Sequence, residues 1–248
     1  MMKLKQYLDS TYLKTAVQAG LTELKNLEVV KAVVAEAIQE NFKLVMIRPE
    51  MVAMAKEMII AAGSKVGVGT VIDFPEGRGT IQEKLQEAQA AINDGADELD
   101  FVVNYTAFKE GRVTEVKQQV LECTRLGMES EKVVKWIIEV AALNKQQIVQ
   151  LSVLIKNVVL ANFEEENYQK VFVKSSTGFY VTDDGMPNGA TLPTVILMLE
   201  NSFPLPVKAA GGIRTYDEAV QMIMLGVKRI GTSSAKAIVK GGSGKSDY

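Results

Sequence analysis

Short apolar runs rich in β-branched residues alternate with amphipathic stretches along most of the chain. Near-continuous apolarity of this kind is typical of parallel strands that are covered on both faces. Seven runs predict buried strands, at residues 42–47, 65–74, 97–103, 133–140, 171–176, 206–211 and 228–234. A shorter candidate strand at residues 6–11 brings the number to eight.

The stretches between these runs predict helices. Thr80 with Glu83, and Thr215 with Glu218, match the capping box, in which two side chains satisfy each other's free backbone amides at a helix start. Strands that alternate with helices imply a parallel sheet, and eight such units favour a closed barrel. The pattern therefore predicts an α/β fold, a single-domain (β/α)8 TIM barrel.

The domain boundaries follow from composition. No linker-like stretch interrupts residues 1–240, whereas residues 241–248, GGSGKSDY, have the composition of a flexible tail. We therefore expect one barrel domain over residues 1–240 and a C-terminal tail over residues 241–248. An open sheet of six or seven strands is the alternative if residues 6–11 form no strand.

Charge narrows the range of partners. The chain has 28 basic and 30 acidic residues among 248, with both signs scattered and a net charge of −2. No basic block suggests contact with nucleic acid, so an anionic ligand must be met by a local site. The first residues lack the apolar stretch of a signal peptide, and no apolar run approaches the length of a membrane span. We expect a soluble cytoplasmic protein with no membrane contact.

The absence of histidine removes much of the catalytic repertoire. With no histidine and only Cys123, a Ser-His-Asp or Cys-His nucleophile, a histidine-ligated zinc and a cysteine-rich zinc site are all excluded. An enzyme of this composition must use lysine, carboxylate, tyrosine, backbone groups or a cofactor. Cys123 lies on a helical pattern, and we expect it to pack structurally.

Charged residues occur in several predicted strands where a plain core would be apolar: Asp9, Asp100, Lys174 and Lys208. The C-terminal ends of barrel strands face the active site. A lone lysine there is usually a solvated tip, but two on adjacent strands beside two aspartates suggest chemistry. Desolvation or a neighbouring cation lowers a lysine pKa and makes the amine a nucleophile. We expect one lysine to attack a carbonyl, with Asp100 as proton shuttle and Asp9 orienting Lys208.

Small and polar loops follow the last predicted strands. Residues 209–215 (AAGGIRT) and 231–238 (GTSSAKAI) each end a strand and open a helix, and residues 175–179 (SSTGF) form a third such loop. Glycines let backbone amides approach an anion, and barrel phosphate sites commonly use the last two loops. These loops predict a phosphate site; tight strand-to-helix turns without a ligand are the alternative.

Together these segments resemble the deoxyribose-phosphate aldolase family. The resemblance rests on LDSTYLK, DELDFVVN, VKSSTGF, KAAGGIRT and IGTSS, which follow one another in order between about residues 8 and 240. It implies a class I aldolase that reversibly splits 2-deoxy-D-ribose 5-phosphate into acetaldehyde and D-glyceraldehyde 3-phosphate. It implies no metal and no cofactor, phosphorylated-sugar and aldehyde ligands, and a possible homodimer.

The resemblance also assigns roles to residues. Lys174 stands at the Schiff-base position, Lys208 at the second lysine, Asp100 at the proton-relaying aspartate and Asp9 at the N-terminal aspartate, while Tyr248 matches a terminal tyrosine that reaches the site in some members. The phosphate-binding positions fall on small residues: Gly178, Gly211, Gly212, Gly231, Ser233 and Ser234.

The chain departs from the family pattern at a few places. Ser10 stands where many members have histidine, Met46 where many have cysteine, and AALN (141–144) where threonine or serine with cysteine is common. These departures leave the lysines and aspartates in place but bear on the surrounding hydrogen bonds. Two other functions stay open: a different Schiff-base aldolase on the same barrel, and a non-catalytic barrel that binds a sugar phosphate.

Overall fold

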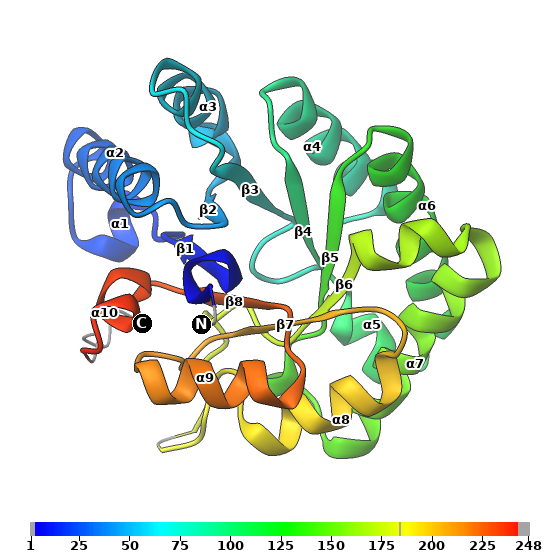
Figure 1. Ribbon diagram of the computed structural model, residues 1–248. Coiled ribbons are helices and arrows are strands. Elements are labelled where there is room, and N and C mark those ends of the chain that lie inside the picture. Colours follow the sequence, from blue (N-terminus) through cyan, green and yellow to red (C-terminus); the bar gives the residue numbers. More distant parts are fainter. Residues whose placement is uncertain (1–2, 184, 243–248) are drawn as a thin grey trace.

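The strands form a closed, all-parallel barrel in which neighbours in space are also neighbours in sequence (Figure 1). This is a computed structural model, and it describes residues 3–183 and 185–242. The predicted single-domain (β/α)8 barrel is confirmed for these residues, including the short first strand. The strands are β1 (Leu8–Thr11), β2 (Leu44–Ile47), β3 (Gly67–Ile72), β4 (Glu98–Val102), β5 (Val133–Ile137), β6 (Val171–Lys174), β7 (Val207–Ala210) and β8 (Arg229–Thr232).

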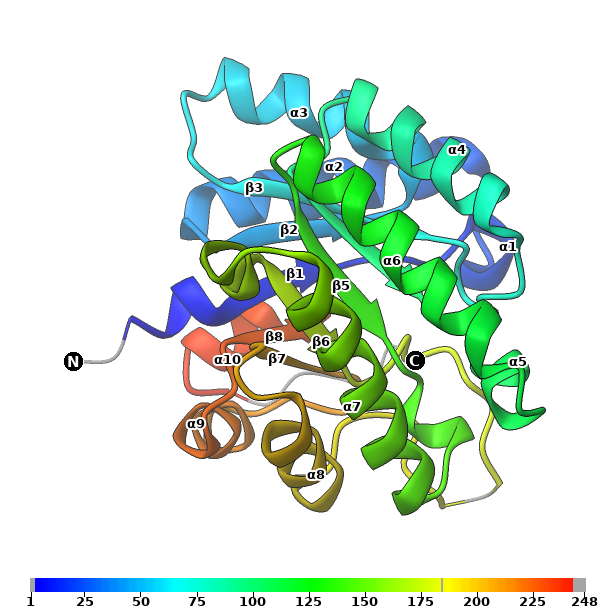
Figure 2. The ribbon, with the colours of Figure 1, turned by 90° about the vertical axis from the view of Figure 1, so that its right-hand side faces the viewer.

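Helices surround the barrel, as the two perpendicular views show (Figures 1 and 2). The α-helices are α1 (Ala16–Ala19), α2 (Glu23–Glu40), α3 (Val52–Ala61), α4 (Ile81–Asn93), α5 (Tyr105–Lys109), α6 (Val113–Glu129), α7 (Lys145–Asn162), α8 (Leu192–Ser202), α9 (Tyr216–Leu225) and α10 (Ala235–Val239). Short 3-10 helices in the described part of the chain span Leu4–Tyr7, Pro49–Met51, Val140–Ala142 and Glu165–Lys170.

Both expected capping boxes are confirmed. At the start of α4, the backbone amide of Glu83 donates to the Thr80 hydroxyl, while the Glu83 carboxylate accepts from the Thr80 amide at 2.7 Å. Thr215 and Glu218 make the same pair of contacts at the start of α9. These helices therefore begin where local sequence alone directs them to begin.

Strands β4 and β5 separate an apolar outer core from charged residues in the barrel interior. Phe101 of β4 stacks on Trp136 of β5 with ring centroids 5.1 Å apart, and the indole N–H donates to Thr124 of the covering helix α6. The preceding residues, Asp100 and Lys135, are register partners on the same two strands. Because successive strand residues face opposite sides, this pair points into the barrel while the aromatic pair points at the helices.

All eight predicted strands are longer than the observed ones, and β5 and β3 show the reason. Strand β5 ends at Ile137 rather than residue 140, because Glu139 adopts a left-handed backbone with φ 56° and Val140–Ala142 form a 3-10 turn. Strand β3 likewise ends at Ile72, before Asp73 at φ 54°. Apolar sequence continues beyond the hydrogen-bonded ladder in both cases, so hydrophobicity alone places the ends too late.

Two expectations concern the ends of the chain and membranes. Residues 243–248, which make up most of the expected tail and include Tyr248, lie outside the described residues. Within the described ranges, no helix combines the length and apolar character that a membrane span requires.

Candidate active site

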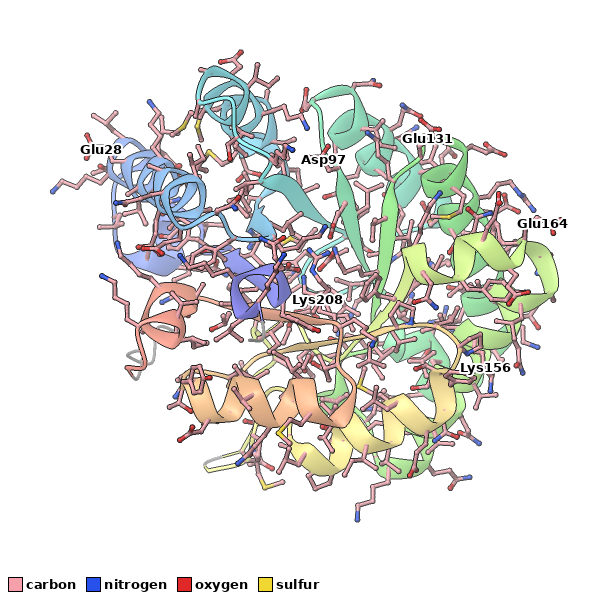
Figure 3. All side chains as sticks on the ribbon, viewed as in Figure 1. Glu28, Asp97, Glu131, Lys156, Glu164 and Lys208 are labelled. Carbon is pink, nitrogen blue, oxygen red and sulfur yellow. The ribbon has the colours of Figure 1, made fainter. Side chains whose placement is uncertain are left out.

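The two lysines and two aspartates expected at the strand ends meet inside the barrel. Lys174 Nζ and Lys208 Nζ each donate to Asp100 Oδ2 at 2.9 Å. Lys208 Nζ also lies 2.7 Å from Asp9 Oδ2. Lys208 marks the middle of the barrel in Figure 3. The four side chains are almost fully buried, so their interactions are shielded very little by water.

Three charged residues that sequence reasoning missed complete the network. Lys135 Nζ donates to Asp100 Oδ1 at 2.6 Å and lies 2.6 Å from Glu98 Oε2. Arg229 then links Glu98, at 2.9 Å, to Asp9, at 2.8 Å. Lysine and glutamate are almost never fully buried without a partner. The lysine in the middle of the apolar run VVKWI therefore indicates, in the sequence itself, a buried charge that needs a partner.

The charges of this network balance only when one lysine is neutral. It holds three carboxylates against four cationic side chains: Asp9, Glu98, Asp100, Lys135, Lys174, Lys208 and Arg229. Fully ionised, these groups carry one excess positive charge, and an uncompensated buried charge is costly. A neutral amine on one lysine removes the excess.

The electrostatic surroundings select Lys174 as that amine. Burial, opposed by Asp100 and aided by the neighbouring Lys208 ammonium, lowers the pKa of Lys174 to about 8. Burial would lower the pKa of Lys135 too, but Asp100 and Glu98 outweigh it and hold that pKa above its ordinary value. Lys174 pairs with only one carboxylate oxygen, which explains the contrast.

Asp100 stays ionised in the middle of the cluster. Burial favours its neutral form, but the ammonium groups of Lys135, Lys174 and Lys208 hold the pKa of Asp100 well below its ordinary value. The site thus offers an amine that can be neutral near physiological pH beside a carboxylate that accepts hydrogen bonds from two lysines. In the part of the chain that the structure describes, no three acidic or cysteine side chains gather to hold a metal ion.

A cleft opens beside Lys174, and the loops after β6, β7 and β8 build it. Five of the six expected phosphate-binding residues line this cleft, together with Arg214, which sequence reasoning did not single out: Gly178, Gly211, Gly212, Gly231 and Ser233. The sixth, Ser234, begins α10 beside the cleft, and its amide donates to Thr232 Oγ1 at 2.9 Å. The structure therefore gathers the expected loops around one small space that also contains the candidate nucleophile.

Two of these glycines are required by close approach. Gly211 has φ 81°, and a Cβ there would lie 2.8 Å from the Cα of Gly189. A Cβ on Gly231 would lie 3.1 Å from Cε of Lys208. Larger residues would push either the loop or the lysine out of place.

Two of the residues that depart from the family pattern, Met46 and Ser10, are buried. Met46 is fully enclosed and packs with Leu13, Leu44 and Val71, against which Phe74 and Phe179 also lie. Ser10 is buried in β1. Cys123 is fully buried in α6, as expected, and burial raises the pKa of its thiol to about 12.

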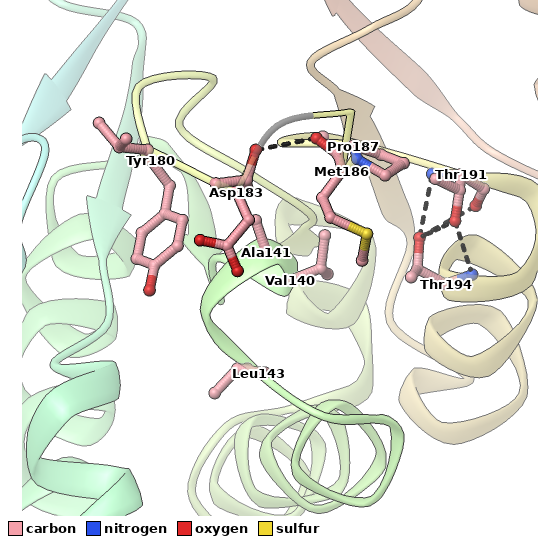
Figure 4. A pocket seen from close by; sticks show the side chains of 12 residues that line it. Val140, Ala141, Leu143, Tyr180, Asp183, Met186, Pro187, Thr191 and Thr194 are labelled. Carbon is pink, nitrogen blue, oxygen red and sulfur yellow. Dashed lines mark hydrogen bonds between the residues drawn. The ribbon is translucent and has the colours of Figure 1, made fainter.

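A second hollow, of about 400 Å³, lies between the segment after β5 and the loop that joins β6 to α8 (Figure 4). Its walls include Val140, Leu143, Tyr180 and Met186, and it ends at Thr194 on the first turn of α8. None of the seven charged network residues lines it. The cleft beside Lys174 is therefore the candidate active site.

The sequence model of the DeoC/LacD family aldolases matches residues 6–241. The deoxyribose-phosphate aldolase of Thermococcus gammatolerans is 38% identical over 242 residues, which cover 97% of this chain and 96% of that protein. The deoxyribose-phosphate aldolase of Streptococcus gordonii is 36% identical over the full length of both chains.

Solved structures agree with the sequence comparison. A putative deoxyribose-phosphate aldolase from Coccidioides immitis superposes with a TM-score of 0.79 at 31% identity, covering 97% of this chain and 86% of that one. The deoxyribose phosphate aldolase of Aeropyrum pernix, described as a tetramer, gives a TM-score of 0.77 at 28% identity, with coverage of 96% and 89%.

Proposed function

The chain belongs to the DeoC/LacD family of aldolases, and on that basis we propose that it reversibly cleaves 2-deoxy-D-ribose 5-phosphate to acetaldehyde and D-glyceraldehyde 3-phosphate. The observation that carries this proposal is the buried amine of Lys174. It lines the cleft, its pKa is lowered to about 8, and it shares one oxygen of Asp100 with Lys208.

The proposed reaction begins at Lys174. In the cleavage direction its neutral amine adds to the C1 aldehyde of the open-chain sugar, and loss of water gives a protonated imine. The C2–C3 bond then breaks: its electron pair moves toward the iminium nitrogen, and the C3 hydroxyl loses its proton as C3 becomes the aldehyde of glyceraldehyde 3-phosphate. Protonation of the remaining enamine at C2 and hydrolysis release acetaldehyde and restore the amine.

Asp100 and Lys208 are the proposed proton carriers. The neighbouring lysines hold the pKa of Asp100 well below its ordinary value, so it is a stable acceptor that can hold a water or a substrate hydroxyl in place. Lys208 contacts both Asp100 and Asp9, which fixes its ammonium beside Lys174. We assign Asp9 the role of orienting Lys208 rather than of touching substrate.

The loops of the cleft are the proposed phosphate site. Gly178, Gly211, Gly212, Gly231 and Ser233 surround the space beside Lys174, and Arg214 adds a positive charge at the same place. A phosphate bound there would anchor the sugar at the end remote from C1. Remote binding energy of this kind holds the reacting carbons in register with the amine. The backbone amide of Ser234 donates to the Thr232 hydroxyl, and through this contact Ser234 supports the loop next to it.

The decisive experiment is reductive trapping. Incubation with acetaldehyde and borohydride should add one ethyl group to the protein, and peptide mass spectrometry should place it on Lys174. Lys174→Ala should take up no label there and should lose turnover while keeping the parent's circular dichroism. Labelling at another lysine, or none, would remove Lys174 from the mechanism.

The substrate is tested separately by comparing aldehyde donors. We expect cleavage of deoxyribose 5-phosphate and, in the synthetic direction, use of acetaldehyde in preference to dihydroxyacetone. Preference for dihydroxyacetone would point to a different Schiff-base aldolase on this barrel. Trapping without turnover of any sugar phosphate would point to a binding protein.

We also propose that the chain forms a homodimer. Two large apolar side chains at neighbouring helix ends, Phe203 after α8 and Met224 in α9, are 78% and 82% exposed. Pairing would remove such surface from water. Sedimentation velocity at micromolar concentration should give twice the monomer mass; a monomer would contradict the proposal.

A further inference from the structure

Glu139 is a buried carboxyl next to the site that the proposed chemistry does not use. It is 1% exposed and follows the end of β5, where it adopts a left-handed backbone with φ 56° and ψ 71°. Such a conformation costs a non-glycine residue of order 1 kcal/mol or more, and it persists where its surroundings hold it. The backbone amides on either side, of Ile138 and Val140, donate to the carbonyls of Lys174 and Ser175 at 2.9 Å.

The carboxyl makes both of its recorded contacts to one residue of the loop after β6. Glu139 Oε2 accepts from the Thr177 hydroxyl through a very short hydrogen bond, and from the Thr177 amide at 3.1 Å. The same hydroxyl oxygen accepts from the amide of Phe179 at 3.0 Å. Glu139 therefore anchors the turn over residues 177–179, and that turn contains Gly178 of the cleft.

The second oxygen, Oε1, is buried and has no hydrogen-bond partner in the described structure. A buried unpartnered carboxylate oxygen is costly, whereas a protonated carboxyl tolerates the same place better. Burial accordingly raises the pKa of Glu139 to about 7, against the two Thr177 hydrogen bonds and the Lys174 ammonium, which lower it.

The charged and titratable groups around Glu139 come from three other elements. Lys174 at the end of β6 favours its ionised form, and Glu76 in the loop after β3 disfavours it. Tyr105 of α5 also senses the charge: its pKa is raised to about 12, by burial first and then by Glu76 and Glu139. Lys174 and Glu139, with pKa values of about 8 and about 7, both change charge near neutral pH.

We propose that Glu139 is a positioning residue of the aldolase reaction: its carboxyl holds Thr177 and the adjoining turn against the cleft, and its negative charge limits how much of Lys174 is present as free amine. An ionised Glu139 stabilises the Lys174 ammonium, and a neutral one does not. This inference rests on the proposed function, because it assumes that the Lys174 amine reacts with a carbonyl.

Two variants separate the contact of Glu139 with Thr177 from the effect of its charge on Lys174. Glu139→Gln keeps the size and an oxygen for Thr177 but has no negative charge. Glu139→Asp keeps the charge but is one methylene shorter, so it no longer reaches Thr177. Glu76→Gln is the control, because it removes a nearby but largely exposed carboxylate without touching Thr177.

Charge coupling is measured by the rate at which acetaldehyde and cyanoborohydride ethylate Lys174. The rate is followed by intact mass from pH 5.5 to 9.5, and each variant's rate is compared with the parent's rate at the same pH. We expect the midpoint for Glu139→Gln to move to lower pH. At pH 7.5 to 8, where the parent's Glu139 is ionised, the variant's rate relative to that at pH 9.5 should then exceed the parent's by about twofold, whereas at pH 6, where Glu139 is already neutral, the two rates should agree. Glu139→Asp and Glu76→Gln should keep the parent's midpoint. An unmoved midpoint in Glu139→Gln would overturn the charge coupling.

Positioning is measured by turnover of deoxyribose 5-phosphate. Glu139→Asp and Thr177→Val should each lower kcat by about tenfold, and the double variant by little more, because both lose one contact. Parent-like kcat in both single variants would overturn the positioning role. A parent that is never ethylated at Lys174 would instead refute the proposed function, so the two failures are distinguishable.

Discussion

Lys174 and Lys208 are register partners on neighbouring strands, and both donate to the same oxygen, Oδ2 of Asp100, at 2.9 Å. Two ammonium groups that share one carboxylate oxygen cannot both be fully neutralised by it. The second contact of Lys208, with Asp9, breaks the symmetry and leaves Lys174 as the less compensated lysine. A difference of one carboxylate thus makes Lys174, rather than Lys208, the candidate nucleophile.

Replacing Lys208 should show this coupling directly. The Lys208 ammonium lowers the pKa of Lys174, so Lys208→Leu should raise that pKa. The rising limb of the pH–rate profile should move to higher pH, and turnover at pH 7 should fall at least about tenfold, since each pH unit is a factor of ten. Lys208→Arg keeps the charge and should keep the position of the limb. An unchanged profile in Lys208→Leu would refute the two-lysine argument.

Burial of Lys174, the candidate nucleophile, should lower the free energy of unfolding. The folded-state pKa of Lys174, about 8, lies below the ordinary value of 10.5. The contribution of Lys174 to the free energy of unfolding is therefore most favourable above about pH 10.5, where the amine is neutral in both states, and it is lost as the pH falls through 8. Lys174→Met removes the penalty and should increase the free energy of unfolding at pH 7 by about 1–3 kcal/mol, with a smaller gain at pH 10.

Urea unfolding of parent and Lys174→Met at the two pH values checks this. The network keeps three carboxylates and three cations in the variant, so no buried charge is left over. Lys117→Met, at an exposed position of α6, should show no such pH dependence. A variant that is less stable than the parent at pH 7 would show that Lys174 is ionised and well compensated in the folded protein.

A negative charge added to the cleft tests the proposed phosphate site. Ser233 lines the cleft, and Ser233→Asp would place a carboxylate against a phosphate dianion. We expect KM for deoxyribose 5-phosphate to rise at least about tenfold, while the much weaker use of unphosphorylated deoxyribose changes little. Ser233→Ala should have a small effect on both substrates. Equal losses on both substrates would place the phosphate elsewhere.

The same test on the adjoining serine probes the loop rather than the ligand. Ser234 is buried and lies outside the lining of the cleft, so Ser234→Asp should weaken phosphate-dependent turnover together with stability. A lower Tm measured by calorimetry would mark this indirect effect. Selective loss on the phosphorylated substrate without any change in Tm would show that Ser234 meets the phosphate itself.

Resistance to aldehydes should not depend on the single cysteine. Unsaturated aldehydes formed from acetaldehyde attack thiolates, and the buried Cys123 thiol has a pKa of about 12. Cys123→Ala should therefore inactivate at the parent's rate during long incubation in acetaldehyde. Met46→Cys places a thiol in the apolar cluster of Leu13, Leu44 and Val71, which is just as enclosed, so this variant should also inactivate at the parent's rate. Protection by Cys123→Ala, or faster inactivation of Met46→Cys, would contradict this account.

Local sequence determined the elements and the order in which they occur. The capping boxes at Thr80 and Thr215 start helices through contacts three residues apart, and the apolar runs form strands in the expected order. Lys174 and Lys208 could be expected to be neighbours because consecutive strands of a barrel pair with each other. These features depend on interactions that are short in sequence or fixed by chain order.

Only the tertiary structure decided which charged residues share the barrel interior. Parallel strands are apolar on both faces, so the sequence does not tell whether Lys135 or Trp136 points inward. Arg229 contacts Asp9 across 220 residues and Glu98 across 131. Such pairings arise when the barrel closes and excludes water, because each buried charge must then find a partner.

The burial of Glu139, too, was decided only by the tertiary structure. In sequence Glu139 lies within an apolar run and nothing marks its partner, and only folding buries it against Thr177, 38 residues later. Its raised pKa exists only because burial removes the water that would stabilise its charge. The chain order therefore supplies the candidate nucleophile and its neighbour, while burial in the closed barrel sets their charge states.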